Sequence, residues 1–185
     1  VPEGKDADPG TIRCAKLGAD MTSIEGDIIK LDVPYVFEAS CMNKIGDTYY
    51  YTYCSNWNVP QSAYEELGIK SAQICYMTSD NPMGPFTLQG AILKNPYDYF
   101  SVGGNNHQSL FEFKGEWYIA YHSQLLDVAV GNGGMGYRST NIDKLTVRED
   151  GKIELIEVAT KKGVKQVGTL DVLNRVEAET MSTMG

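Results

Sequence analysis

The sequence has 185 residues, of which 42% are hydrophobic and 22% are charged. This balance is typical of a globular domain and excludes a disordered chain, a collagen and a coiled coil, and no run of about 18 apolar residues offers a membrane span. Sixteen basic residues against 24 acidic ones give a formal net charge of −8. We therefore expect no nucleic acid and no anionic membrane as a partner, because both bind basic surfaces.

The predicted elements are almost all β-strands. Residues 40–54 are predicted to form a hairpin, because two strand-like runs flank the tight-turn pair Gly46-Asp47. Four tyrosines in the second run favour a pleated surface. Helical character is confined to residues 61–69, where Gly68 would end the helix. Further strands are expected at residues 71–78 and 85–93, joined by a loop of turn-forming residues.

A second hairpin is predicted over residues 108–122, with its turn at Lys114-Gly115-Glu116. Three late strands are expected around residues 135–138, 145–148 and 153–158, and a turn over residues 149–152 separates the last two. Short strands with frequent turns indicate an all-β fold.

The four cysteines contain no CxxC pair, which argues against a zinc knuckle. Cys41 and Cys54 lie on the two arms of the first hairpin. The sequence allows either a disulfide between them or free, buried thiols. The 12 tyrosines, five phenylalanines and two tryptophans also have two interpretations. Buried rings build a core, whereas exposed ring faces serve as platforms for sugars.

The two hairpins form an internal repeat with an offset of 69 residues. Glu38 precedes Gly46 by eight residues, and His107 precedes Gly115 by the same number. Repeats of antiparallel strands at this spacing indicate the blades of a β-propeller, in which the first strand of each blade lines the central axis. Glu38 and His107 should therefore converge at that axis. The chain provides about two and a half blades, fewer than the four or more that a closed propeller needs.

Several segments, taken together and in this order, resemble glycoside hydrolase family 43, the five-bladed β-propeller enzymes that act on arabinoxylan, xylan and arabinan. The similarity covers roughly residues 8–170 and is strongest to arabinofuranosidases that act on arabinoxylan. The segments that carry it are residues 11–13 and 20–23, Pro34-Tyr35-Val36-Phe37-Glu38-Ala39-Ser40, residues 44–53, Gly104-Asn105-Asn106-His107-Gln108-Ser109, residues 117–122 and Gly136-Tyr137-Arg138-Ser139.

The resemblance implies the later blades of a five-bladed propeller over residues 1–170, incomplete in this chain. It further implies an inverting glycosidase, either an α-L-arabinofuranosidase or a β-xylosidase, with Glu38 as the general acid. Glycoside hydrolysis needs a second, ionised carboxylate as the general base. No Asp before Glu38 matches the family's base or the Asp that tunes the acid. We therefore expect both from a missing N-terminal part, which is possibly a separate chain, and we expect this chain alone to be inactive.

The resemblance suggests roles for His107 and Arg138, and residue type and position suggest roles for Asn105, Asn106 and Trp57, each with a structural alternative. His107 matches a histidine associated with a calcium ion at the axis, and otherwise is a hydrogen-bonded core residue. Arg138 matches an arginine near the acid or the sugar, and otherwise forms a structural ion pair. Asn105 and Asn106 bind a sugar hydroxyl or cap a turn, and Trp57 is either a sugar platform or a packing residue.

Residues 174–179 resemble the opening of a family 6 carbohydrate-binding module, so residues 171–185 are interpreted as a linker and its first strand. An ordinary C-terminal strand is the alternative. The expected substrate is arabinoxylan or a xylo-oligosaccharide, and the expected location is secreted or periplasmic. Two other functions remain open, a non-catalytic carbohydrate-binding propeller and a scaffold propeller without affinity for sugar.

Overall fold

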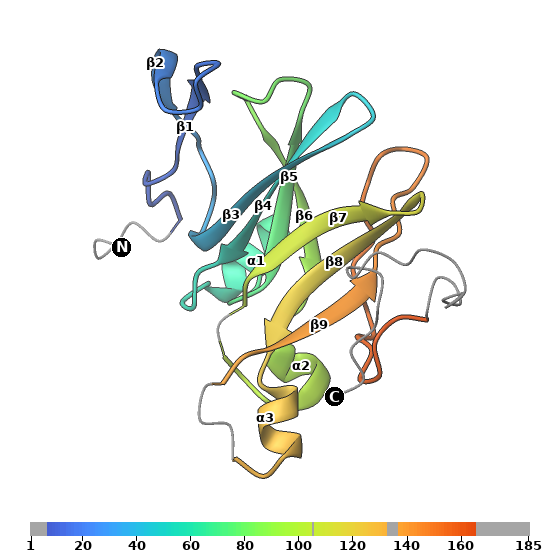
Figure 1. The fold of residues 1–185 in the computed structure, drawn as a ribbon. Coiled ribbons are helices and arrows are strands. Elements are labelled where there is room, and N and C mark those ends of the chain that lie inside the picture. Colours follow the sequence, from blue (N-terminus) through green and yellow to red (C-terminus); the bar gives the residue numbers. More distant parts are fainter. Residues whose placement is uncertain (1–6, 105, 133–136, 166–185) are drawn as a thin grey trace, which may run out of the picture.

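The computed structural model describes residues 7–104, 106–132 and 137–165. Figure 1 shows antiparallel sheets arranged side by side, with three short helices at their ends. The strands are β1 (Arg13–Leu17), β2 (Ile24–Lys30), β3 (Val36–Ile45), β4 (Thr48–Ser55), β5 (Ile74–Ser79), β6 (Thr87–Leu93), β7 (Gln108–Phe113), β8 (Glu116–Ser123) and β9 (Ser139–Lys144). The helices are α1 (Gln61–Leu67), α2 (Pro96–Phe100) and α3 (Leu125–Ala129).

The strands form three meanders in chain order. β1 pairs with β2, β3 to β6 form a four-stranded sheet, and β7 to β9 form a three-stranded sheet. Both predicted hairpins are confirmed, because β3–β4 turns at Gly46-Asp47 and β7–β8 turns at Lys114-Gly115. Helix α1 is also confirmed, and Gly68 ends it with a left-handed φ of 71°.

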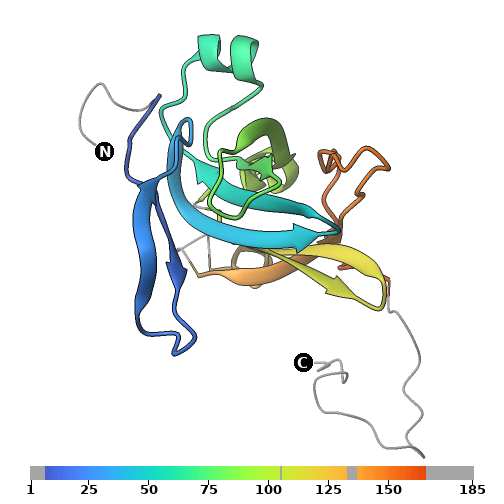
Figure 2. The same cartoon turned by 90° about the horizontal axis from the view of Figure 1, so that it is seen from above.

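The β1–β2 hairpin stands to one side of the four-stranded sheet in both views (Figures 1 and 2). Sequence reasoning missed it. It also missed the helices α2 and α3, although α2 has clear signals, since the Asn95 side chain accepts the Tyr97 N–H and Pro96 occupies the first turn. None of the helices in the described part of the chain has the length and apolar character needed to cross a membrane.

The late strands differ from the prediction. Tyr137 and Arg138 precede the strand β9, and the rest of the expected strand at 135–138 lies outside the described residues. Residues 145–158 form isolated bridges in place of two strands, Val147 with Ile153 and Ile156 with Leu93. Their backbone is divided between the local turn at Gly151 and single long-range bonds, from Leu145 N–H to the Trp117 carbonyl and from Ile156 N–H to the Ile92 carbonyl.

Two apolar clusters hold the sheets together. The first contains buried residues of both large sheets and of the segment 145–159, among them Tyr50, Tyr76, Ile119 and Ile153. The second joins the four-stranded sheet to the β1–β2 hairpin through residues such as Leu31 and Met77. Because apolar burial is the main driving force of folding, the first cluster fixes how the two large sheets lie against each other.

Candidate active site

Glu38 lies near the start of β3, where this strand is irregular. The register against β4 shifts between Val36 and Glu38 and again between Glu38 and Cys41. Ala39 has a left-handed φ of 64°, which is uncommon for a residue with a side chain. An extra residue of this kind bends a strand and redirects the side chains beside it. The chain therefore departs from regular strand geometry at the position of Glu38.

His107 directly precedes β7 and reaches Glu38 from the neighbouring sheet. Its Nε2 lies 2.9 Å from Oε1 of Glu38, which is hydrogen-bond distance. The strands β3 and β7 also lie against each other, as Figure 2 shows for the two sheets seen from above. The predicted convergence of these two equivalent positions is confirmed, while their catalytic roles stay predictions.

The pair is supported from β4 and β8. The His122 ring on β8 lies 5.4 Å from the His107 ring, with the planes tilted by 49°. Cys54 is the β4 partner of Glu38, and burial raises the pKa of this thiol to about 12, with the Glu38 charge adding to the effect. Cys41 is partly buried, and all four thiols are free, so the disulfide alternative is not realised.

The carboxyl and the imidazole remain accessible. The side chains of Glu38 and His107 are 36% and 43% exposed. The neighbours of Glu38 in the chain leave it open to solvent, since Tyr35 and Ala39 are only partly buried and Phe37 is 42% exposed. A substrate atom can therefore reach the carboxyl.

Among the described residues, Trp57, Asn106 and Arg138 have no hydrogen bond or ion pair with Glu38 or His107 through their side chains. Trp57 is 42% exposed, as a sugar platform requires, and Arg138 is exposed just before β9. Asn106 is fully buried, and neither polar atom of its side chain has a hydrogen-bond partner. That burial does not suit direct contact with a sugar. Asn105 lies outside the described residues.

The residues around His107 do not fit a calcium site on their own. Within residues 7–104, 106–132 and 137–165, no group of three or more His, Cys, Asp or Glu side chains is arranged to hold a metal ion. Calcium takes six to eight oxygen ligands, whereas His107 provides a nitrogen that already contacts Glu38.

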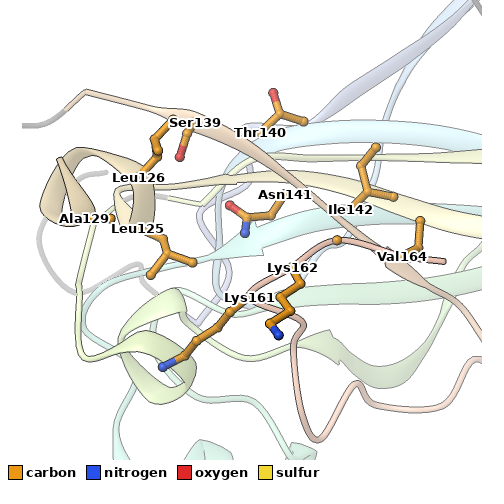
Figure 3. Close-up of a pocket in the computed structure, with 11 residues that line it drawn as sticks. Leu125, Leu126, Ala129, Ser139, Thr140, Asn141, Ile142, Lys161, Lys162 and Val164 are labelled. Carbon is orange, nitrogen blue, oxygen red and sulfur yellow. The ribbon is translucent and has the colours of Figure 1, made fainter. Parts of the chain in front are cut away.

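A pocket of about 540 Å3 lies elsewhere, between α3, β9 and the segment 161–164 (Figure 3). Leu125, Leu126 and Ile142 give it apolar walls, and Lys161 and Lys162 lie at its rim. Neither Glu38 nor His107 lines it. The candidate active site is therefore the accessible pair of side chains and not this pocket.

Gln108 is the residue that sequence reasoning missed. Its Nε2 donates to the Ala39 carbonyl at 2.7 Å and to the Thr52 hydroxyl at 2.9 Å. Gln108 is the repeat equivalent of Ala39, because it follows at the same offset of 69 residues. That offset was the available signal, but it did not reveal that the two positions touch.

Comparison with known proteins decides the family. The sequence profile described as "Glycosyl hydrolases family 43" matches residues 2–153, which is well over half of the chain. The chain belongs to glycosyl hydrolase family 43. Its large sheets are blades of the five-bladed β-propeller of this family, of which the chain covers only part. The propeller expected from the repeat is thereby confirmed.

Relatives within family 43 include two arabinoxylan arabinofuranohydrolases. The protein of Paenibacillus polymyxa is 47% identical over 95% of this chain, and that of Bacillus subtilis is 46% identical over 99%. A solved structure of the Bacillus subtilis enzyme, in complex with cellotetraose, matches 95% of this chain with a TM-score of 0.85. The chain spans only 27% and 35% of the length of the two curated relatives.

Proposed function

We propose that this chain provides the acid-bearing blades of a family 43 glycosidase that removes arabinose or xylose units from arabinoxylan or xylo-oligosaccharides. The observation that carries the proposal is the contact of 2.9 Å between Glu38 and His107, at the meeting point of two blades. The relatives named arabinoxylan arabinofuranohydrolase and the more distant β-xylosidase of Xylanibacter ruminicola support the substrate class.

The proposed reaction is a single displacement with inversion. Water attacks the anomeric carbon while the bond from that carbon to the leaving oxygen breaks. The proton of the Glu38 carboxyl passes to the leaving oxygen, and a proton of the attacking water passes to a carboxylate outside this chain. In inverting enzymes the two carboxyl groups are about 6.5–9.5 Å apart, which leaves room for the water.

His107 orients the acid in this scheme. A hydrogen bond at 2.9 Å restricts the Glu38 side chain to one side of the axis, so its other oxygen can face the leaving group. Trp57 and Arg138 are proposed to contact the sugar at the rim, and Asn105 stays a candidate for the same role. A calcium ion near His107 also stays a proposal, with its oxygen ligands supplied by water or by other blades.

The test is Glu38→Gln in the complete enzyme that contains this sequence. We expect kcat/KM on aryl arabinofuranosides or aryl xylosides with poor leaving groups to fall about 10²–10⁴-fold, because an amide has no acidic proton to give. Glu112→Gln is the matched control, since Glu112 is an exposed residue of β7 and should leave the rate unchanged. Equal rates for Glu38→Gln and the unchanged protein would contradict the proposal.

The same assay separates the alternative functions. Because no general base is recognised in this chain, a non-catalytic carbohydrate-binding propeller predicts sugar binding without turnover, and a scaffold predicts neither. We further propose a secreted or periplasmic location, since the polysaccharide substrate lies outside the cell. The carbohydrate-binding module suggested by residues 174–179 stays a proposal, because these residues lie outside the described part of the chain.

A further inference from the structure

The backbone around Glu38 contains two left-handed residues, Tyr35 with φ 52° and Ala39 with φ 64°. Neither is glycine, and residues with a side chain occupy this region only when surrounding contacts hold them there. The hydrogen bonds accepted by the carbonyl groups of these two residues show which contacts hold the left-handed conformation.

The two carbonyl groups are held in different ways. The Tyr35 carbonyl accepts the Asn56 N–H at 2.7 Å, a backbone bond within the same blade region. The Ala39 carbonyl accepts Nε2 of Gln108 at 2.7 Å, from a side chain of the next blade. The peptide between Ala39 and Ser40, one residue beyond Glu38, is thus held by the first residue of β7, the strand that directly follows His107.

The Gln108 side-chain amide is held by two hydrogen bonds, both donated by its Nε2 atom. Nε2 has two hydrogens, and its two acceptors are the Ala39 carbonyl and the hydroxyl of Thr52, which is fully buried on β4. The Oε1 atom of Gln108 is buried without a hydrogen-bond partner. The side chain is therefore placed to donate, and one of its two acceptors is the carbonyl of left-handed Ala39, the residue after Glu38.

We propose that Gln108 is a positioning residue for the proton donor: its amide holds the carbonyl of Ala39, the left-handed residue that follows Glu38, and thereby fixes the direction of the Glu38 carboxyl. This inference rests on the proposed function, because it assumes that Glu38 gives a proton to the leaving oxygen. Gln108 does not touch the substrate in this scheme and acts only through the backbone of Ala39.

The test uses the dependence of rate on the leaving group. Proton donation matters for a basic leaving oxygen and little for a good leaving group such as 2,4-dinitrophenolate. In the complete enzyme, Gln108→Met keeps the length of the side chain and removes both donors. We expect about a tenfold loss of kcat/KM on aryl arabinofuranosides with poor leaving groups and less than about a twofold loss on the dinitrophenyl substrate.

Asn43→Leu is the matched control. Asn43 makes the same kind of link between blades, since its Nδ2 donates to the Leu110 carbonyl at 2.9 Å, but it lies five residues beyond Glu38. Asn43→Leu should lower the midpoint of thermal unfolding without changing how kcat/KM depends on the leaving group. The proposal is overturned if Gln108→Met lowers kcat/KM equally on all substrates. It is also overturned if Asn43→Leu makes kcat/KM depend as steeply on the leaving group as Gln108→Met does.

Two further arms complete the design. If Gln108→Met does not fold, Thr52→Val is used instead, because it removes only the second acceptor of the Gln108 amide. A loss of kcat/KM that is two- to threefold larger on poor than on good leaving groups supports the proposal, and an equal loss on both overturns it. Glu38→Gln serves as the reference for the acid. If that variant shows no dependence on the leaving group, the proposed function fails; if it does and Gln108→Met does not, only the positioning role fails.

Discussion

The β3–β4 and β7–β8 hairpins have the same plan and differ at one place. Both turn at a glycine, and their equivalent residues are separated by 69 positions. The β7–β8 ladder is regular from Gln108 to Phe113, whereas the β3–β4 ladder is interrupted on both sides of Glu38. Regular pairing is the default for antiparallel strands, and bulges concentrate where a side chain must be redirected.

This difference shows how a repeated unit can become specialised. Gln108, the first residue of β7, contacts Ala39, and His107, directly before this strand, contacts Glu38. The irregular hairpin thus carries Glu38, the proposed acid, and the regular one contacts it through His107. Three experiments test that division.

Thiol labelling tests whether the irregular strand stays closed against β4. Cys54 is fully buried, and burial raises the pKa of its thiol to about 12, so at neutral pH the reactive thiolate is scarce and shielded from reagents. We expect a disulfide reagent to modify partly buried Cys41 first and Cys54 only on unfolding, as mass spectrometry of the labelled peptides would show. Modification of both at similar rates would mean that the bulge opens β3 from β4.

Removing the imidazole tests whether the regular hairpin orients the acid. As the proposed acid, Glu38 must hold its proton, so the bond is to a neutral carboxyl and contributes about 0.5–1.5 kcal/mol. His107→Ala should therefore lower kcat/KM of the complete enzyme about 2–10-fold. His107→Gln keeps a donor near the position of Nε2 and should retain more activity. Full activity of His107→Ala, or no difference between the two variants, contradicts an orienting role.

A β-branched residue tests the backbone difference itself. Ala39→Val should lower the free energy of unfolding by about 1–3 kcal/mol, because a branched side chain is strained at a left-handed φ. Ser109→Val is the matched change on the regular hairpin, where the residue is exposed in an ordinary strand, and should change stability by less than about 0.5 kcal/mol. Denaturant unfolding measures both, and equal effects would remove the distinction between the hairpins.

The sequence was sufficient to predict the repeat and the meeting of Glu38 with His107. Strand and turn signals depend on local residue types, and the offset of 69 residues follows from counting. The bulge was not predictable in this way, because Ala39 carries no glycine signal and its conformation depends on Gln108, which is distant in the chain. The strands expected near residues 145–158 failed for a similar reason, since tertiary contacts hold that segment in isolated bridges.

The segment after β9 has a consequence for how the protein melts. It returns from the second blade to the first, where the Tyr50 hydroxyl donates to the Gly151 carbonyl, the Tyr76 hydroxyl accepts the Ile153 N–H at 3.0 Å, and Ile156 pairs with Leu93. The two blades are therefore joined by the segment of residues 151–156 as well as by their shared apolar core. Neither should come apart alone, and calorimetry should record their loss as one cooperative transition.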